Sequence, residues 1–113
     1  MNVLLSAWGS TGEQAPGVHL IKLLVKQEFS VDVLASEARA DLYQGLGIRF
    51  HSLRSIDIQH YPYASLQKEG EVVRHFVDPL CNEQFARASE LIAQQSVDLL
   101  LSSWITPGVV TAA

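Results

Sequence analysis

Two kinds of hydrophobic pattern alternate along this chain. Short apolar runs at residues 2–7, 29–35, 48–53 and 97–101 predict four β-strands, and their near-continuity is typical of strands buried on both faces. Between them, apolar residues recur every three or four positions over 16–27 and 80–95, which predicts two amphipathic helices. Residues 54–70 follow neither period and predict a loop. A last helix is expected to begin near residue 106.

Polar residues and glycines refine the predicted boundaries. Ser36 can cap a further helix after the second strand, and Gly47 can end that helix with a positive φ. Asp78 precedes a proline and is expected to lie outside the α-helical region. For the helix over 80–95, the pattern predicts a buried face made of Cys81, Phe85, Ala88, Leu91 and Ile92.

Strands that alternate with helices indicate an α/β fold with a Rossmann-like parallel sheet and flanking helices. In that strand order the first and fourth strands are neighbours. Ligands of such sheets bind at the carboxyl ends of the strands, where the chain changes its direction of progress. We therefore expect a crevice lined by residues 9–13 and 102–106.

The turn after the first strand carries the most specific candidate chemistry. It reads Gly-Ser-Thr-Gly-Glu-Gln-Ala-Pro over residues 9–16 and places the Glu13 carboxylate between two glycines and a proline. Pro16 suits the first turn of a helix, because it lacks only an N–H that would have no partner there. Glu13 is either a general base for an acceptor hydroxyl or a residue that complements the helix dipole.

The same turn resembles the start of GT-B-fold glycosyltransferases with a family 28 N-terminal domain, the sterol, antibiotic and UDP-glucuronosyl-type enzymes. Those enzymes carry Gly-Ser-x-Gly-Asp-x-x-Pro after a hydrophobic strand, and related members have a catalytic histidine where this chain has Glu13. The three later strands follow in the same order, so the resemblance covers most of the chain except residues 54–79. The departure is Glu13 itself, where the family has Asp or His.

The resemblance implies an inverting glycosyltransferase (a hexosyltransferase, EC 2.4) that moves a sugar from a UDP- or dTDP-linked donor to a hydroxyl group. The acceptor would be a lipid, a sterol or a secondary metabolite, and no cofactor is implied beside the donor substrate. Glu13 would be the base. The turn and the far side of the crevice would bind substrate through Gly9, Ser10, Thr11, Gly12, Ser103 and Trp104. Residues 1–113 would form part of the acceptor-binding domain, with the nucleotide sugar held by a C-terminal domain outside this chain, so we expect the chain alone to be inactive.

Composition limits the classes of protein to which the chain could belong. The chain has 113 residues, a net charge of −4 and scattered basic residues, which favours one domain that does not bind nucleic acid. Cys81 is the single cysteine and is expected to be a buried, unreactive thiol, and no histidine pair has metal-ligand spacing. The apolar runs are too short for a signal peptide or a transmembrane segment, so we expect a cytoplasmic protein, either soluble or peripheral to a membrane.

Two alternatives stay open at this point. One is a nucleotide-binding oxidoreductase domain, although the Gly-x-Gly-x-x-Gly fingerprint is absent. The other is a non-catalytic acceptor subunit of a split glycosyltransferase. Aromatic side chains that would suit an apolar acceptor pocket are Tyr61, Tyr63 and Trp104. The simpler interpretation is core packing for Trp104 and exposure in a loop for the two tyrosines.

Overall fold

The computed structural model describes residues 1–8, 11–54, 78–102 and 107–113. Four strands form one parallel sheet: β1 (Asn2–Ser6), β2 (Ser30–Ser36), β3 (Arg49–Leu53) and β4 (Leu99–Ser102). Their order is β3-β2-β1-β4. The predicted α/β class, the parallel sheet and the pairing of the first strand with the fourth are therefore confirmed.

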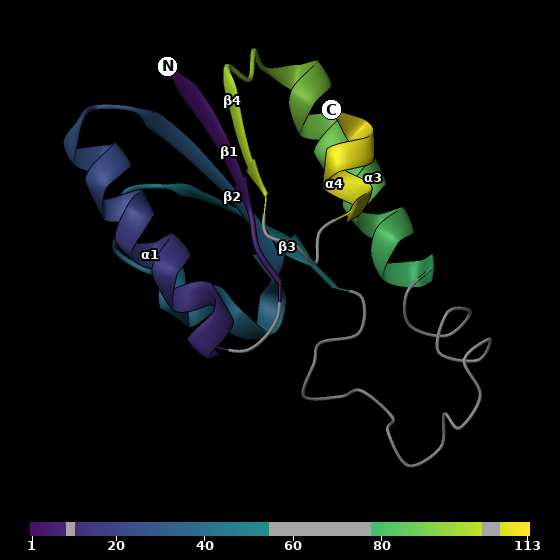
Figure 1. The fold of residues 1–113 in the computed structure, drawn as a ribbon, viewed down its shortest axis with the longest axis horizontal. Coiled ribbons are helices and arrows are strands. Elements are labelled where there is room, and N and C mark those ends of the chain that lie inside the picture. Colours follow the sequence, from purple (N-terminus) through teal and green to yellow (C-terminus); the bar gives the residue numbers. More distant parts are fainter. Residues whose placement is uncertain (9–10, 55–77, 103–106) are drawn as a thin grey trace.

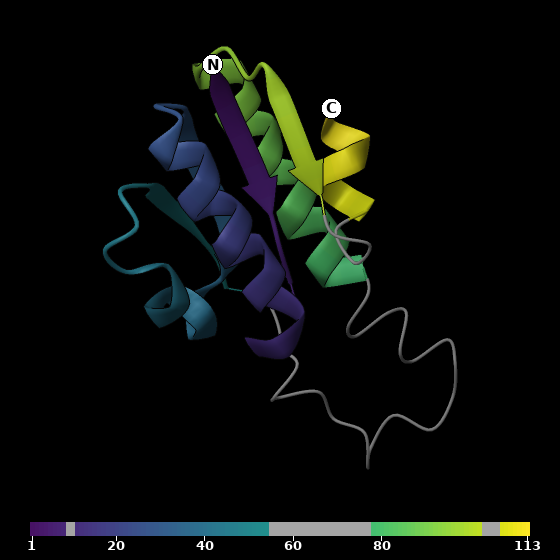
Figure 2. The same cartoon turned by 60° about the vertical axis from the view of Figure 1, so that its left-hand side comes forward.

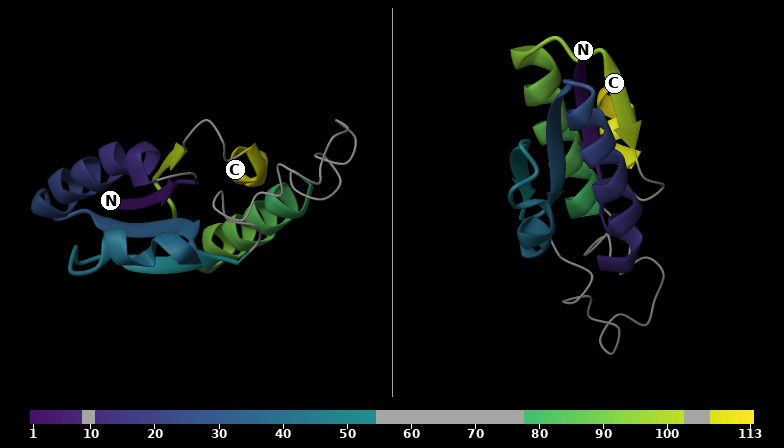
Figure 3. Two further views of the ribbon diagram at one scale, coloured as in Figure 1. Left: turned by 90° about the horizontal axis from the view of Figure 1, so that it is seen from below. Right: turned by 90° about the vertical axis from the view of Figure 1, so that its left-hand side faces the viewer.

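Helices cover both faces of this sheet (Figures 1 and 2). Helix α1 (Thr11–Lys26) and the 3₁₀ helix η1 (Glu37–Tyr43) lie on one side, and α3 (Asp78–Gln94) and α4 (Pro107–Ala112) lie together on the other. The left view of Figure 3 shows α1 at one side of the strands and α3 with α4 at the other. None of the described helices has both the length and the apolar character needed to cross a membrane.

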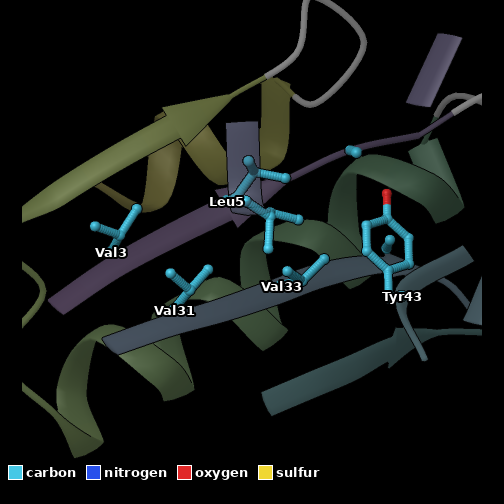
Figure 4. Close-up of a cluster of buried hydrophobic side chains, with 8 residues drawn as sticks. Val3, Leu5, Val31, Val33 and Tyr43 are labelled. Atoms are coloured by element: carbon cyan, nitrogen blue, oxygen red, sulfur yellow. The ribbon is translucent and has the colours of Figure 1, made fainter. Parts of the chain in front are cut away.

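Each face of the sheet has its own hydrophobic core, because successive side chains of a strand point to opposite faces. On the α1 side, alternate residues of β1 and β2 pack with Tyr43 (Figure 4) and with Ile21 of α1. On the α3 side, Leu4 and Leu34 pack with Leu53, Ala88, Leu91 and Val109. The central strands are thus buried on both faces, as their continuous apolar runs predict.

Helix α1 begins earlier than the sequence predicts. It starts at Thr11, so Pro16 lies inside the helix and not in its first turn. A proline there removes the N–H that would bond to the carbonyl group of residue i−4, which is Gly12. The first turn is held instead by tertiary contacts of Gln14, which is buried and accepts a hydrogen bond from Tyr43. Glu13, which the sequence analysis placed in the turn before the helix, lies in the first turn of α1.

The prediction of a helix from Ser36 to Gly47 is wrong in type, cap and length. The element is a 3₁₀ helix that ends at Tyr43, and the Ser36 side chain makes no capping hydrogen bond. Ser36 is the buried last residue of β2 and pairs with Leu53, so it belongs to the sheet. Gly47 does have the predicted positive φ, 74°, and Gly45 has a φ of 73°.

The predicted face of the helix over 80–95 is confirmed at Ala88, Leu91 and Ile92, but its first half is displaced by one residue. Helix α3 starts at Asp78, contrary to the expectation for that residue. Its buried positions are Leu80, Gln84, Ala88 and Leu91, whereas Phe85 is 47% exposed. Gln84 occupies a core position because its Oε1 accepts a hydrogen bond of 3.1 Å from the Gly108 N–H of α4. Cys81 is only half-buried, although burial and the charge of Asp78 raise the pKa of its thiol.

Candidate functional site

A cavity of about 280 Å³ lies between the first turns of α1 and the carboxyl ends of β1 and β4. Its walls are largely apolar and carry one carboxylate. The lining residues are Leu5, Ser6, Ala7, Glu13, Gln14, Gly17, Leu20, Leu101 and Ser102. This is the edge at which parallel sheets bind ligands, between the first and fourth strands. The cavity can therefore hold an apolar small molecule with a polar group turned toward the carboxylate.

Glu13 supplies that carboxylate. It is an exposed residue in the first turn of α1, next to the exposed Gly12. Backbone N–H groups at a helix N-terminus favour a negative charge nearby. The geometry thus places an acidic side chain beside an apolar cavity, and its catalytic role stays a prediction.

The first turn of α1 is anchored from the far side of the helix. The Tyr43 hydroxyl donates a 2.7 Å hydrogen bond to Oε1 of Gln14, and both residues are buried. Burial raises the pKa of Tyr43 to about 12, so the phenol is a neutral donor at physiological pH. Its ring also packs against Phe50 of β3, with centroids 5.4 Å apart. The residue next to Glu13 is therefore fixed to η1.

Most of the other predicted site residues lie outside the described part of the chain. These are Gly9, Ser10, Ser103 and Trp104, and so are the aromatic candidates Tyr61 and Tyr63. Thr11 is the first residue of α1, and its side chain is not described. From the predicted crevice, the structure brings Glu13 and Ser102 to one cavity.

The sequence analysis missed a polar cluster around Asp32 on the α3 side of the sheet. Asp32 is 2% exposed and accepts hydrogen bonds from Arg49 (2.9 Å and 2.8 Å), His51 (2.8 Å) and Gln95 (2.9 Å). Burial raises the pKa of Asp32, but the hydrogen bonds from Arg49 and His51 and the Arg49 charge outweigh it, so the pKa lies below its usual value. The available signal was the charged residue itself, at the centre of an apolar strand.

A resident metal site is not found among the described residues. No group of three or more histidine, cysteine, aspartate or glutamate side chains there could hold an ion. The Asp32 cluster has one acidic group, and its oxygens are already occupied by the Arg49 guanidinium, His51 and Gln95.

Three solved structures with a similar fold are glycosyltransferases. UGT2 of Phytolacca americana, in its apo form, matches with a TM-score of 0.69 and 22% identity over 99% of this chain. The glycosyltransferase SsfS6 of Streptomyces sp. SF2575 matches with a TM-score of 0.65 and 23% identity over 100% of it. A UGT transferase from Siraitia grosvenorii in complex with UDP matches with a TM-score of 0.63 and 15% identity over 99% of it.

These matches show that the described part of the chain has the fold of the N-terminal part of glycosyltransferase structures. The chain spans 26%, 36% and 25% of the three matched chains. No protein-family model matches the sequence, and a search of curated proteins finds no significant match.

Proposed function

We propose that this chain is part of the acceptor-binding domain of a glycosyltransferase of the GT-B type, with an N-terminal domain of the family 28 kind. The observation that carries the proposal is the Glu13 carboxylate beside an apolar cavity, in a fold shared with three glycosyltransferases. The turn at residues 9–16 supports it independently, because it follows the family's motif apart from Glu13.

In this proposal Glu13 acts as the general base. A carboxylate oxygen of Glu13 takes the proton from the acceptor hydroxyl, and the hydroxyl oxygen forms a bond to the anomeric carbon of the donor sugar. The bond from that carbon to the nucleoside diphosphate breaks, and the diphosphate leaves with the electron pair. Attack from the opposite face inverts the anomeric centre. A base is needed because a neutral hydroxyl is a weak nucleophile.

The cavity suits an apolar acceptor. Leu5, Leu20 and Leu101 line it, so a lipid, sterol or aromatic secondary metabolite would bury its hydrophobic body there and expose a hydroxyl to Glu13. We propose that Gly9, Ser10, Thr11 and Gly12 shape the turn around that hydroxyl and that Ser103 and Trp104 complete the acceptor side.

The donor would be a UDP- or dTDP-sugar held mainly by a second domain. Support comes from the size of the matched structures, of which this chain spans about a quarter to a third, and from the Siraitia grosvenorii structure, which is a complex with UDP. An enzyme of this kind would act in the cytoplasm or at its membrane surfaces.

Substitution of Glu13 in the whole enzyme tests the general-base role. Glu13→Gln keeps the size and a hydrogen-bonding amide but cannot take a proton, so kcat on a fixed acceptor should fall about 10²–10⁴-fold. Glu13→Asp keeps the base but shortens it by one methylene, so its kcat should lie between wild type and Gln. The matched control is Glu28→Gln, two residues beyond the end of α1, which should keep wild-type kcat.

Thermal melts of the same variants separate catalysis from stability. If Glu13 only complements the helix dipole, Glu13→Gln should lower the free energy of unfolding by a few tenths of a kcal/mol up to about 1 kcal/mol. Turnover should then stay intact. A Gln variant within a few-fold of the wild-type kcat would end the general-base assignment.

Calorimetry on the 113-residue chain alone tests the division between the two domains. We expect weak or undetectable binding of UDP and no donor hydrolysis, because most donor contacts would lie in the second domain. NAD serves as the comparison ligand. Saturable NAD binding would favour a nucleotide-binding oxidoreductase domain, and tight UDP binding would contradict the proposed division.

A further inference from the structure

A second and larger cavity opens on the other side of the sheet. It has a volume of about 460 Å³ and lies between the carboxyl half of β3 and the first half of α3. Its lining consists of Phe50, His51, Ser52, Arg54, Glu83 and Arg87. No residue is shared with the cavity beside Glu13. Both lie toward the carboxyl ends of the strands, where ligands of parallel sheets bind.

His51 is a fixed wall of this cavity. Its Nε2 donates a 2.8 Å hydrogen bond to Oδ1 of Asp32, and its side chain is 22% exposed. Asp32 does not present a net charge to the cavity, because Arg49 donates to both of its oxygens. The aspartate therefore orients the imidazole without repelling an anion.

Two guanidinium groups line the cavity, and each also contacts a carboxylate. Arg54 contacts Glu37 through Nε at 3.7 Å, and Arg87 contacts Glu90 through Nη1 at 2.8 Å. These are exposed ion pairs, which contribute little free energy and use a fraction of the donors on each side chain. The remaining N–H groups have the fork geometry that matches carboxylate and phosphate oxygens. The whole chain carries a net charge of −4, so a generally basic surface does not explain why two arginines line one cavity.

We propose that the cavity between β3 and α3 binds a small molecule through an oxyanion, a phosphate or a carboxylate, held by Arg54 and Arg87. Glu83 is the one acidic side chain in the described lining, and it limits the affinity for a doubly charged ligand. The site does not depend on sugar transfer, so it stands or falls separately from the function proposed for Glu13.

An NMR titration of the protein at constant ionic strength tests the site. Inorganic phosphate and sodium acetate are the two probes, added separately while amide shifts are followed. We expect at least one probe to produce saturable shifts at His51, Ser52 and Arg87, and the probe that binds more tightly identifies the oxyanion. The absence of saturation with both probes would overturn the proposal.

Charge-matched variants assign the binding to the arginines. The double variant Arg54→Gln/Arg87→Gln should bind at least about tenfold more weakly, since hydrogen bonds to charged groups are lost. Lys22→Gln/Lys26→Gln, on α1 across the sheet, changes the net charge equally and should stay within twofold of wild type. Glu83→Gln should bind the anion more tightly, because it removes a negative charge from the lining. Equal losses in the two double variants, or weaker binding by Glu83→Gln, would contradict the assignment.

Discussion

Asp32 is the residue whose environment departs furthest from what its type predicts. It is a carboxylate within an apolar strand, and it is stabilised there by donors from Arg49, His51 and Gln95. These partners are 17, 19 and 63 residues away in the sequence. The cluster therefore connects β2 and β3 to the end of α3. Substitution of Asp32 measures how much the cluster contributes to the free energy of unfolding.

Asp32→Asn should lower the free energy of unfolding at pH 7 by about 1–3 kcal/mol, since it removes charged hydrogen bonds at a buried site. The pH dependence should change as well. The pKa of Asp32 is lowered by folding, so its contribution is complete above the unfolded-state pKa of about 3.9 and is lost as the pH falls through the folded-state value. Urea unfolding between pH 7 and pH 3 should show a steeper acid loss for wild type than for Asp32→Asn. The exposed Asp41→Asn is the control, and parallel wild-type and Asp32→Asn curves would contradict the role of this carboxylate.

Tyr43→Phe should lower the free energy of unfolding by about 1 kcal/mol, because the hydrogen bond to Gln14 is lost while the ring packing remains. Burial raises the pKa of Tyr43 to about 12, so the folded state holds the phenolic proton more tightly than the unfolded chain. This stabilisation is present below pH 10 and is lost as the pH rises toward 12. Chemical denaturation at pH 8 and pH 11 measures the difference. An alkaline loss of equal size in the Phe variant would rule out Tyr43 as its source.

At the scale of the elements, two helical glycines lie in opposite environments. A Cβ at Gly17 of α1 would meet Leu5 Cδ2 at 3.8 Å, an ordinary contact. A Cβ at Gly108 of α4 would collide with the Cys81 carbonyl oxygen and lie 2.8 Å from Gln84 Cβ. Helix α4 thus approaches α3 closely because residue 108 has no side chain.

Alanine substitution of each glycine should have opposite effects. Gly17→Ala should stabilise the protein by about 0.5–1 kcal/mol, because alanine loses less backbone entropy in a helix. Gly108→Ala should destabilise it by about 1–3 kcal/mol, because the overpacked methyl group separates α4 from α3. Thermal unfolding of the pair checks the contrast. Stabilisation by Gly108→Ala would mean that the close approach of the two helices is wrong.

The elements also separate what the sequence could predict from what it could not. The strands were predicted to within two residues, because a parallel strand needs a continuous apolar run and little else. The start of α1 and the first half of the α3 face were mispredicted, and both contain a buried glutamine. Gln14 and Gln84 look polar in a pattern, yet each is held in the core by a partner on another element. For the site, the turn motif singled out Glu13 next to the N-terminus of a helix, whereas the Asp32 cluster required contacts that no local pattern contains.

On the scale of the whole molecule, stability should be concentrated in the centre of the sheet. Strands β1 and β2 have neighbours on both sides and fully buried side chains such as Leu4, Val33 and Leu34. Helix α4 has six residues, and its Val110 is 59% exposed. The inner strands bury more apolar surface than α4, so local opening should require more free energy in the strands than in α4.

Amide hydrogen exchange should reflect this difference. The slowest exchange is expected at Leu4, Leu5, Val33 and Leu34, and exchange in α4 and η1 should be faster by orders of magnitude. NMR-detected exchange at neutral pH measures both. Uniform protection across β1 and α4 would contradict a core centred on the inner strands.

The central claim concerns sugar transfer to a hydroxyl group, and the anomeric configuration of the product tests it most directly. The whole enzyme is incubated with an α-linked UDP-sugar and a hydrophobic alcohol, and the product is analysed by mass spectrometry and NMR. The account predicts one added hexose in β linkage, formed by wild type and reduced at least about a hundredfold in Glu13→Gln. A product with retained α linkage, or no transfer from either UDP- or dTDP-sugars to any apolar acceptor tested, would contradict it.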